Sequence, residues 1–152
     1  MSVPQSDAGP YSALLLAHPR SSPHQQPLVR ADATAEAVNA LCGDRITVML
    51  ALSAGRIRDY AFQAEACVLT RATASLLGDW LPDRTVTQVQ ALRAGCARML
   101  AGDAGASMHL GELAALSDLA QYPARHACVL LPFAAVCTAL ERSAHKHAED
   151  CR

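Results

Sequence analysis

The sequence predicts an α+β fold, in which a small antiparallel sheet of about three strands is covered by helices and the C-terminal half is rich in helix. Hydrophobic residues alternate through residues 45–52 and 57–64, the period of a half-buried strand. Further along, the spacing changes to three and four residues, the period of an amphipathic helix. A length of 152 residues and a hydrophobic fraction of 51% suit one domain with its own core. We therefore expect a single domain over residues 1–152, with flexible tails at 1–10 and 145–152.

The two predicted strands form a hairpin. In the first strand, residues 45–52, one face collects Ile46, Val48, Leu50 and Leu52. Residues 53–56 contain a glycine and form the turn. The second strand, residues 57–64, places Tyr60, Phe62 and Ala64 on one face. Because the loop between them is so short, the two strands must run antiparallel.

Helices follow the hairpin and account for most of the remaining chain. Gly78 is expected to stop the first of them, and Thr85 or Thr87 to cap the second. Pro132 is expected to kink the last helix or distort its first turn. A glycine- and alanine-rich loop is expected at residues 101–107. The predicted helical segments are residues 11–17, 67–77, 86–100, 110–119 and 125–144.

Charge and hydropathy exclude several classes of protein. The chain has 13 Lys and Arg against 14 Asp and Glu, whereas nucleic-acid-binding domains usually carry a basic excess. Residues 1–10 have no basic stretch, and the apolar run at 13–17 is too short for a secretory signal. No stretch approaches 18 consecutive apolar residues, so we expect no membrane span. We therefore expect a cytoplasmic protein with reduced thiols and with neither nucleic acid nor membrane as a partner.

The chain contains six cysteines: Cys42, Cys67, Cys96, Cys128, Cys137 and Cys151. In a reducing compartment an even count is weak evidence for disulfides, and metal binding or thiol chemistry is the better alternative. There is no Cys-x-x-Cys pair, so any metal site must be assembled by the fold from distant residues. Cys96 and Cys137 lie on apolar helix faces and are expected in the core. Cys151 falls in the polar tail with His145 and His147.

The other three cysteines lie at element boundaries. Cys42 precedes the first clear strand, Cys67 opens a helix, and Cys128 lies in the first turn of the last helix. Helix N-termini stabilise thiolates, the form that binds metals and attacks sulfur. Asp44 adds an oxygen ligand, and Gly43 lets the loop turn tightly. Three thiolates and one carboxylate suit tetrahedral zinc, although each cysteine taken singly also fits a small core residue.

Three motifs occur in a characteristic order along the chain. They are Cys42-Gly43-Asp44, then Ala66-Cys67-Val68-Leu69-Thr70-Arg71-Ala72-Thr73-Ala74-Ser75, then Pro123-Ala124-Arg125-His126-Ala127-Cys128. With these motifs, the chain from about residue 11 to residue 142 resembles the iron–sulfur cluster scaffold family of IscU, the NifU N-terminal domain and SufU. His18-Pro19-Arg20 is similar to the His-x-x-x-Pro-Arg-Asn segment of that family. Residues 95–109 and Leu110-Gly111-Glu112-Leu113 are most similar to the SufU branch, and the Leu-Pro-Pro-Val-Lys motif and the His-Cys pair of the IscU branch are missing.

The resemblance implies an iron–sulfur cluster assembly protein that works as a zinc-bound sulfur relay. Its metal ligands would be Cys42, Asp44, Cys67 and Cys128, and Cys42 would accept persulfide sulfur from a pyridoxal-phosphate cysteine desulfurase similar to SufS. At most, such a protein is a zinc-dependent sulfurtransferase, and it would pass sulfur to downstream iron–sulfur acceptors or scaffolds. Zinc keeps a thiolate deprotonated, and ligand exchange at the metal can release it for attack.

Two alternatives share the same residues. In the first, the protein is a scaffold that assembles and transfers a [2Fe–2S] cluster or binds iron. In the second, it is a divergent paralogue without transfer activity, because Ala64-Glu65-Ala66 replaces a glycine-rich run of the family. Alanine at positions that require positive φ costs roughly 1 kcal/mol, so the loop holding Cys67 is expected to differ. Arg125 and His126 are possible accessory residues, and either a monomer or a dimer is compatible with the sequence.

Overall fold

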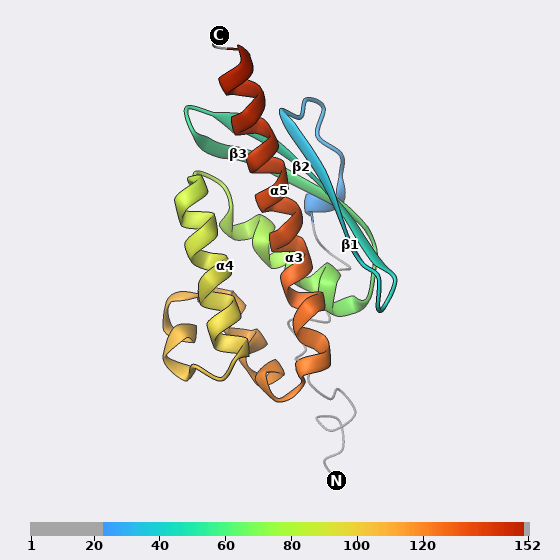
Figure 1. Cartoon of the computed structure of the whole chain (residues 1–152), viewed down its shortest axis with the longest axis vertical. Coiled ribbons are helices and arrows are strands. Elements are labelled where there is room, and N and C mark those ends of the chain that lie inside the picture. Colours follow the sequence, from blue (N-terminus) through green and yellow to red (C-terminus); the bar gives the residue numbers. More distant parts are fainter. Residues whose placement is uncertain (1–22, 151–152) are drawn as a thin grey trace.

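Three antiparallel strands in the order β1–β2–β3 form one sheet, and helices lie in layers on one side of it (Figure 1). The computed structural model describes residues 23–150. The fold is therefore α+β, as predicted. The elements are η1 (Pro23–Gln25), β1 (Ala33–Asn39), β2 (Asp44–Ser53), β3 (Arg56–Glu65), α3 (Val68–Trp80), α4 (Val86–Leu100), η2 (Ala104–His109), η3 (Gly111–Gln121), η4 (Pro123–Arg125) and α5 (His126–Asp150), where η marks a 3-10 helix.

Strands β2 and β3 confirm the predicted hairpin. Val48 and Leu50 of β2 are fully buried and pair with Phe62 and Tyr60 of β3, which are also buried. The arrangement follows from the period of a strand, which sends alternate side chains to one face. Ala64, expected on the same face, is half-buried and pairs with Ile46.

Strand β1 was not located in the sequence, although a third strand was expected. It alternates as the others do, with Ala33 and Ala35 buried and Thr34 and Glu36 exposed. The alternation is carried by alanine, which has a low strand propensity, and so the pattern is weak when read locally. Pairing with β2 along its whole length forms the strand.

Helix α3 corrects the predicted stop at Gly78. The helix continues to Trp80 and ends just before Pro82, which has no N–H to offer a further helical turn. Gly78 lies inside the helix, where the imidazole of His24 packs against it and leaves no room for a Cβ. His24 also forms a 2.9 Å hydrogen bond with Asp79, which fixes η1 on α3.

The later helices mostly follow the predictions. Helix α4 has the predicted bounds, and Thr85 caps it through a capping box with Gln88. The predicted short helix at 110–119 is a 3-10 helix, η3, and the second half of the predicted loop at 101–107 belongs to η2. Every third residue from position 110 is a buried leucine, which matches the three-residue turn of a 3-10 helix: Leu110, Leu113, Leu116 and Leu119.

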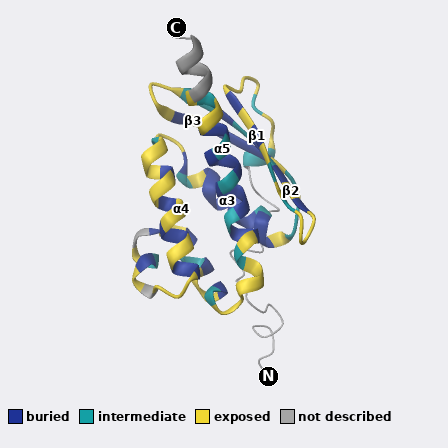
Figure 2. Ribbon diagram, viewed as in Figure 1, coloured by how far each residue is buried: buried dark blue, intermediate teal, exposed yellow. Residues whose placement is uncertain are grey.

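Helix α5 lies between the sheet and the other helices, where it contacts β1, β2, α3 and α4 (Figures 1 and 2). It extends to Asp150, beyond the predicted end at residue 144. Pro132 lies inside this helix and is buried. Among residues 23–150, the stretch Pro123–Ala144 alone is long and apolar enough to cross a membrane, and just over half of its apolar 18-residue window is buried in the fold. Its central position accounts for its apolar composition. The predicted helix at 11–17, the His18-Pro19-Arg20 segment and the tail at 1–10 lie outside the described residues.

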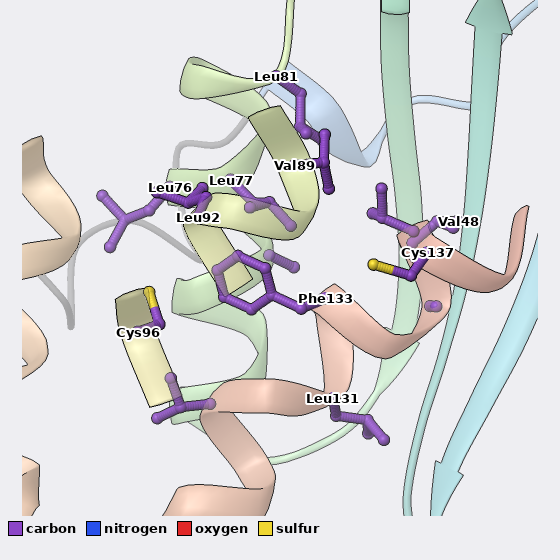
Figure 3. Close-up of a cluster of buried hydrophobic side chains, with 14 of the residues drawn as sticks. Val48, Leu76, Leu77, Leu81, Val89, Leu92, Cys96, Leu131, Phe133 and Cys137 are labelled. Carbon is purple, nitrogen blue, oxygen red and sulfur yellow. The ribbon is translucent and has the colours of Figure 1, made fainter. Parts of the chain in front are cut away.

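Phe133 extends from α5 into the space between α3 and α4 and is fully buried (Figure 3). Cys96 of α4 and Cys137 of α5 belong to the same hydrophobic cluster, which confirms that both pack in the core. Burial raises the pKa of the Cys96 thiol to about 12, so at neutral pH this group is an uncharged core side chain.

The turn between β2 and β3 yields the first prediction. Ala54 has a φ of 53° and Gly55 a φ of 78°, so both lie in the left-handed region. In a two-residue hairpin loop asparagine and glycine favour this conformation, whereas alanine is strained in it. We expect Ala54→Asn to raise the free energy of unfolding by about 1 kcal/mol, measured by urea denaturation. Ser53→Asn, at the neighbouring strand position, is the control; an equal gain from both variants would contradict this account.

Candidate metal centre

The turn between β1 and β2 presents Cys42. Asn39 and Asp44 are paired at the ends of the two strands, and the Gly43 N–H closes the turn by donating to the Asn39 carbonyl at 2.8 Å. Gly43 has a φ of 75°, which confirms its predicted role in the tight turn. As a result, Cys42 is exposed at the tip, whereas the Asp44 side chain turns inward and is only 4% exposed.

Two helix starts meet this turn at one end of the sheet (Figure 1). Cys67 is the N-cap residue of α3, and its backbone N–H donates to Asp44 Oδ1 at 2.9 Å. Cys128 lies in the first turn of α5 and is buried. The three boundary cysteines and Asp44, which are up to 86 residues apart along the chain, are therefore brought together by β2, α3 and α5.

The donor atoms of Cys42, Asp44 and Cys128 all lie within 4.8 Å of one another. The Cys42 and Cys128 sulfurs are 3.9 Å apart. Two thiolates on one tetrahedral zinc, with Zn–S near 2.3 Å, are separated by about 3.8 Å, so this spacing fits the ion. Cys67 contacts the group through Asp44, since its Sγ lies 3.3 Å from Asp44 Oδ2. The donor set thus has the composition and spacing of a thiolate-rich metal site.

Hydrogen bonds keep Asp44 ionised despite its burial. Burial alone would raise the pKa of this carboxyl, but donors from the Cys67 backbone and from the Cys42, Thr70 and Cys67 side chains outweigh it. The net pKa of Asp44 is lowered from its usual value. The site therefore holds a carboxylate, ready to act as a ligand, in a largely buried position.

The Cys128 thiol departs from the expectation that a helix N-terminus favours thiolate. Burial raises its pKa, and so do the charges and hydrogen bonds of Cys67 and Cys42 beside it. Burial is the largest of these contributions, because it disfavours the charged form of the thiol. A divalent ion reverses the balance, because coordination deprotonates thiols outright.

Thr70 is a residue of the site that the sequence analysis did not single out. Its side chain is fully buried in the first turn of α3, and its Oγ1 lies 2.9 Å from Asp44 Oδ2 and 3.1 Å from the Cys128 carbonyl. The sequence signal was its spacing: Thr70 follows Cys67 by three residues, and residues three apart share one face of a helix.

The two accessory residues lie beside the group without joining it. Arg125 is exposed, and the ion pairs found within residues 23–150 include none between it and Asp44. The His126 ring lies 2.8 Å from the Leu119 carbonyl through Nε2 and so ties η3 to the start of α5. An accessory role of either residue stays a prediction.

The alanines that replace family glycines do not strain the loop before Cys67. Ala64 continues β3, and neither Ala64 nor Ala66 is among the described residues with positive φ. The expected cost of about 1 kcal/mol per alanine therefore does not arise. His145, His147 and Cys151 fall outside the part of the chain whose side chains are described.

A three-stranded sheet that supports two helix starts around a cysteine and aspartate cluster defines a small domain that presents a group with the composition of a thiolate metal site. The sequence of this chain matches the NifU-like N-terminal domain over residues 11–129, and the chain belongs to that family. It is 29% identical over 132 residues to the iron–sulfur cluster assembly scaffold protein IscU of Thermotoga maritima, covering 87% of this chain and 93% of that protein.

Two further proteins support the same assignment. The chain is 27% identical over 99 residues to the zinc-dependent sulfurtransferase SufU of Bacillus subtilis, covering 64% of this chain and 67% of that protein. The crystal structure of a nitrogen-fixing NifU-like protein (N-terminal) from Brucella abortus superposes with a TM-score of 0.81 at 26% identity, covering 92% of this chain and 98% of that one. The predicted family is thereby confirmed.

The burial of the cysteines predicts an order of thiol reactivity. In reduced, chelator-treated protein we expect Cys42 to be alkylated first by iodoacetamide among the five cysteines that the structure describes, because it is exposed. Cys96 should be modified far more slowly, because it is buried and its pKa is about 12. Peptide mapping by mass spectrometry over a time course measures the order. Modification of Cys96 as fast as Cys42 would show that the core opens more readily than this packing implies.

Proposed function

We propose that this protein is a zinc-bound sulfur relay of iron–sulfur cluster assembly, which accepts persulfide sulfur on Cys42 from a cysteine desulfurase. The observation that carries the proposal is the group of Cys42, Asp44 and Cys128 within 4.8 Å, with Cys67 hydrogen-bonded to Asp44. The similarity to a SufU that is named as a zinc-dependent sulfurtransferase supports it.

The residues of the site would have two roles, holding the metal and accepting sulfur. Asp44, Cys67 and Cys128 would hold zinc from the inner side, and bound zinc supplies the charge that keeps the thiols deprotonated. Among the cysteines that the structure describes, only Cys42 is exposed, at the tip of a turn, so a partner can approach it. Its thiolate attacks the outer sulfur of the desulfurase persulfide; the new S–S bond forms on Cys42 and the desulfurase cysteine leaves as a thiolate.

Exposed apolar side chains beside the site suit a docking partner. Leu41, next to Cys42, is 97% exposed, and Val68, next to Cys67, is 41% exposed. Clusters of exposed apolar residues near a reactive group commonly mark contact surfaces. We propose that a SufS-like desulfurase covers them during transfer, in the reducing environment of the cytoplasm.

A second candidate function is that of a scaffold for a [2Fe–2S] cluster on the same residues. The similarity to a protein named as the IscU scaffold, over most of both chains, favours it. Asp44 would then weaken the hold on the cluster, because carboxylate is a poorer ligand for iron than thiolate. Anaerobic reconstitution with iron and sulfide separates the two functions. A coloured product with stoichiometric iron supports the scaffold, and a colourless product that retains zinc supports the relay.

The sulfur relay predicts that Cys42 is indispensable. Wild-type protein should contain one zinc per chain and raise the turnover of a SufS-like desulfurase. Cys42→Ala should leave turnover at the rate of the desulfurase alone, because the exposed acceptor is gone. Cys137→Ala removes a core thiol instead and should retain stimulation. Alanine release from cysteine measures turnover. Full stimulation by Cys42→Ala, or wild-type protein without zinc, would refute the proposal.

The docking surface predicts a separation of partner binding from metal binding. Leu41→Ser should raise several-fold the concentration of desulfurase that gives half-maximal stimulation. The zinc content should stay at the wild-type value, since Leu41 is exposed and holds no metal. Val29→Ser is the matched control, because Val29 is equally exposed but precedes the opposite end of β1. Equal effects of the two substitutions would place the contact surface elsewhere.

A further inference from the structure

The Thr70 hydroxyl lies between two competing acceptors. Its Oγ1 is 2.9 Å from Asp44 Oδ2 and 3.1 Å from the carbonyl oxygen of Cys128, and the Cys67 sulfur is 3.4 Å away. A hydroxyl carries one proton, so it donates fully to one of the two oxygens at a time. Because the side chain is fully buried, neither oxygen can easily take water as a substitute donor.

Pro132 explains why the Cys128 carbonyl is one of these acceptors. In an α-helix the carbonyl of a residue accepts from the N–H four residues further on. For Cys128 that residue is Pro132, which lies inside α5 and has no N–H. The Thr70 hydroxyl replaces this missing N–H, since its Oγ1 lies 3.1 Å from the Cys128 carbonyl oxygen.

We propose that Thr70 is a positioning residue with two hydrogen-bonded states. It donates to Asp44 while the carboxylate is free of metal, and to the Cys128 carbonyl when a metal would hold the carboxylate. Pro132 keeps the second acceptor available. When Asp44 leaves the metal, the buried carboxylate gains a donor at once, and the group that gives up this donor is the neutral Cys128 carbonyl, for which the loss costs less than it would for a buried charge. The inference rests on the metal site of the proposed function and identifies what makes its carboxylate ligand exchangeable.

Zinc release tests the first state. Thr70→Val retains the shape of the side chain but removes the hydroxyl, and Thr70→Ser retains the hydroxyl as the matched control. Each protein is loaded with Zn²⁺ and mixed with an excess of a chromophoric chelator. We expect Thr70→Val to release zinc about tenfold more slowly than wild type, because the departing carboxylate loses a charge-assisted hydrogen bond. Thr70→Ser should match wild type. Unchanged or faster release from Thr70→Val would overturn the proposal.

The competition between the two acceptors has its own test. Pro132→Ala supplies an N–H to the Cys128 carbonyl, which then depends less on Thr70. The slowing caused by Thr70→Val should therefore be larger in the Pro132→Ala background than in the wild-type background. Equal slowing in both would show that the two acceptors are independent and would overturn the two-state arrangement. Urea denaturation of the metal-free variants shows whether each one is folded. If Pro132→Ala does not fold, the comparison of Thr70→Val with Thr70→Ser decides the proposal.

These outcomes separate this inference from the sulfur relay. Wild-type protein without zinc would overturn both. Normal zinc binding with identical release from the Thr70 variants overturns only the role of Thr70. The expected release pattern without stimulation of a desulfurase supports the role of Thr70 and overturns the relay.

Discussion

The buried carboxylate of Asp44 is the interaction on which the site depends. It lies at the first residue of β2 and accepts hydrogen bonds from the backbone of Cys67, the N-cap residue of α3, and from Thr70 in the first turn of α3. Thr70 in turn lies against the Cys128 carbonyl at the start of α5. A charge this deeply buried is tolerated only when it is well paired, so the sheet and the two helix starts are held in register by the need to satisfy it.

The rest of the fold supplies a rigid support for that arrangement. Helix α5 lies on the sheet, and Phe133 anchors it between α3 and α4 (Figure 3). Since the start of α5 carries Cys128, the packing of its apolar middle fixes where that sulfur lies. The layers that form the core therefore also set the 3.9 Å spacing between the Cys128 and Cys42 sulfurs.

The site combines one accessible thiol with protected ones. Cys42 is exposed on a turn, Cys67 is half-buried, and Cys128 is buried. This gradient follows from their positions, since a hairpin tip faces solvent and the first turn of a core helix does not. An acceptor of sulfur needs a reachable atom, whereas the atoms that hold a metal gain from exclusion of water. In the proposed sulfur relay, the two demands would be met by different cysteines of one cluster.

Local pattern in the sequence determined much of the molecule. Alternation placed β2 and β3, helical spacing placed α4 at its observed bounds, and Cys67 was correctly set at a helix start. The motifs around Cys42, Cys67 and Cys128 indicated the family, because they keep their order and residue types along the chain. These features are local, since strands, helices and turns each reflect the preferences of neighbouring residues.

Other features were decided only by tertiary structure. The alanine-rich β1 forms because β2 is beside it, and the glycine at position 78, inside α3, makes room for the ring of His24. Thr70 joins the site for the same reason: its partners, Asp44 and Cys128, are 26 residues before it and 58 residues after it. Hydrogen bonds across such separations leave no periodic trace in the sequence. They exist only when packing has brought the elements together and left the buried polar groups no other partners.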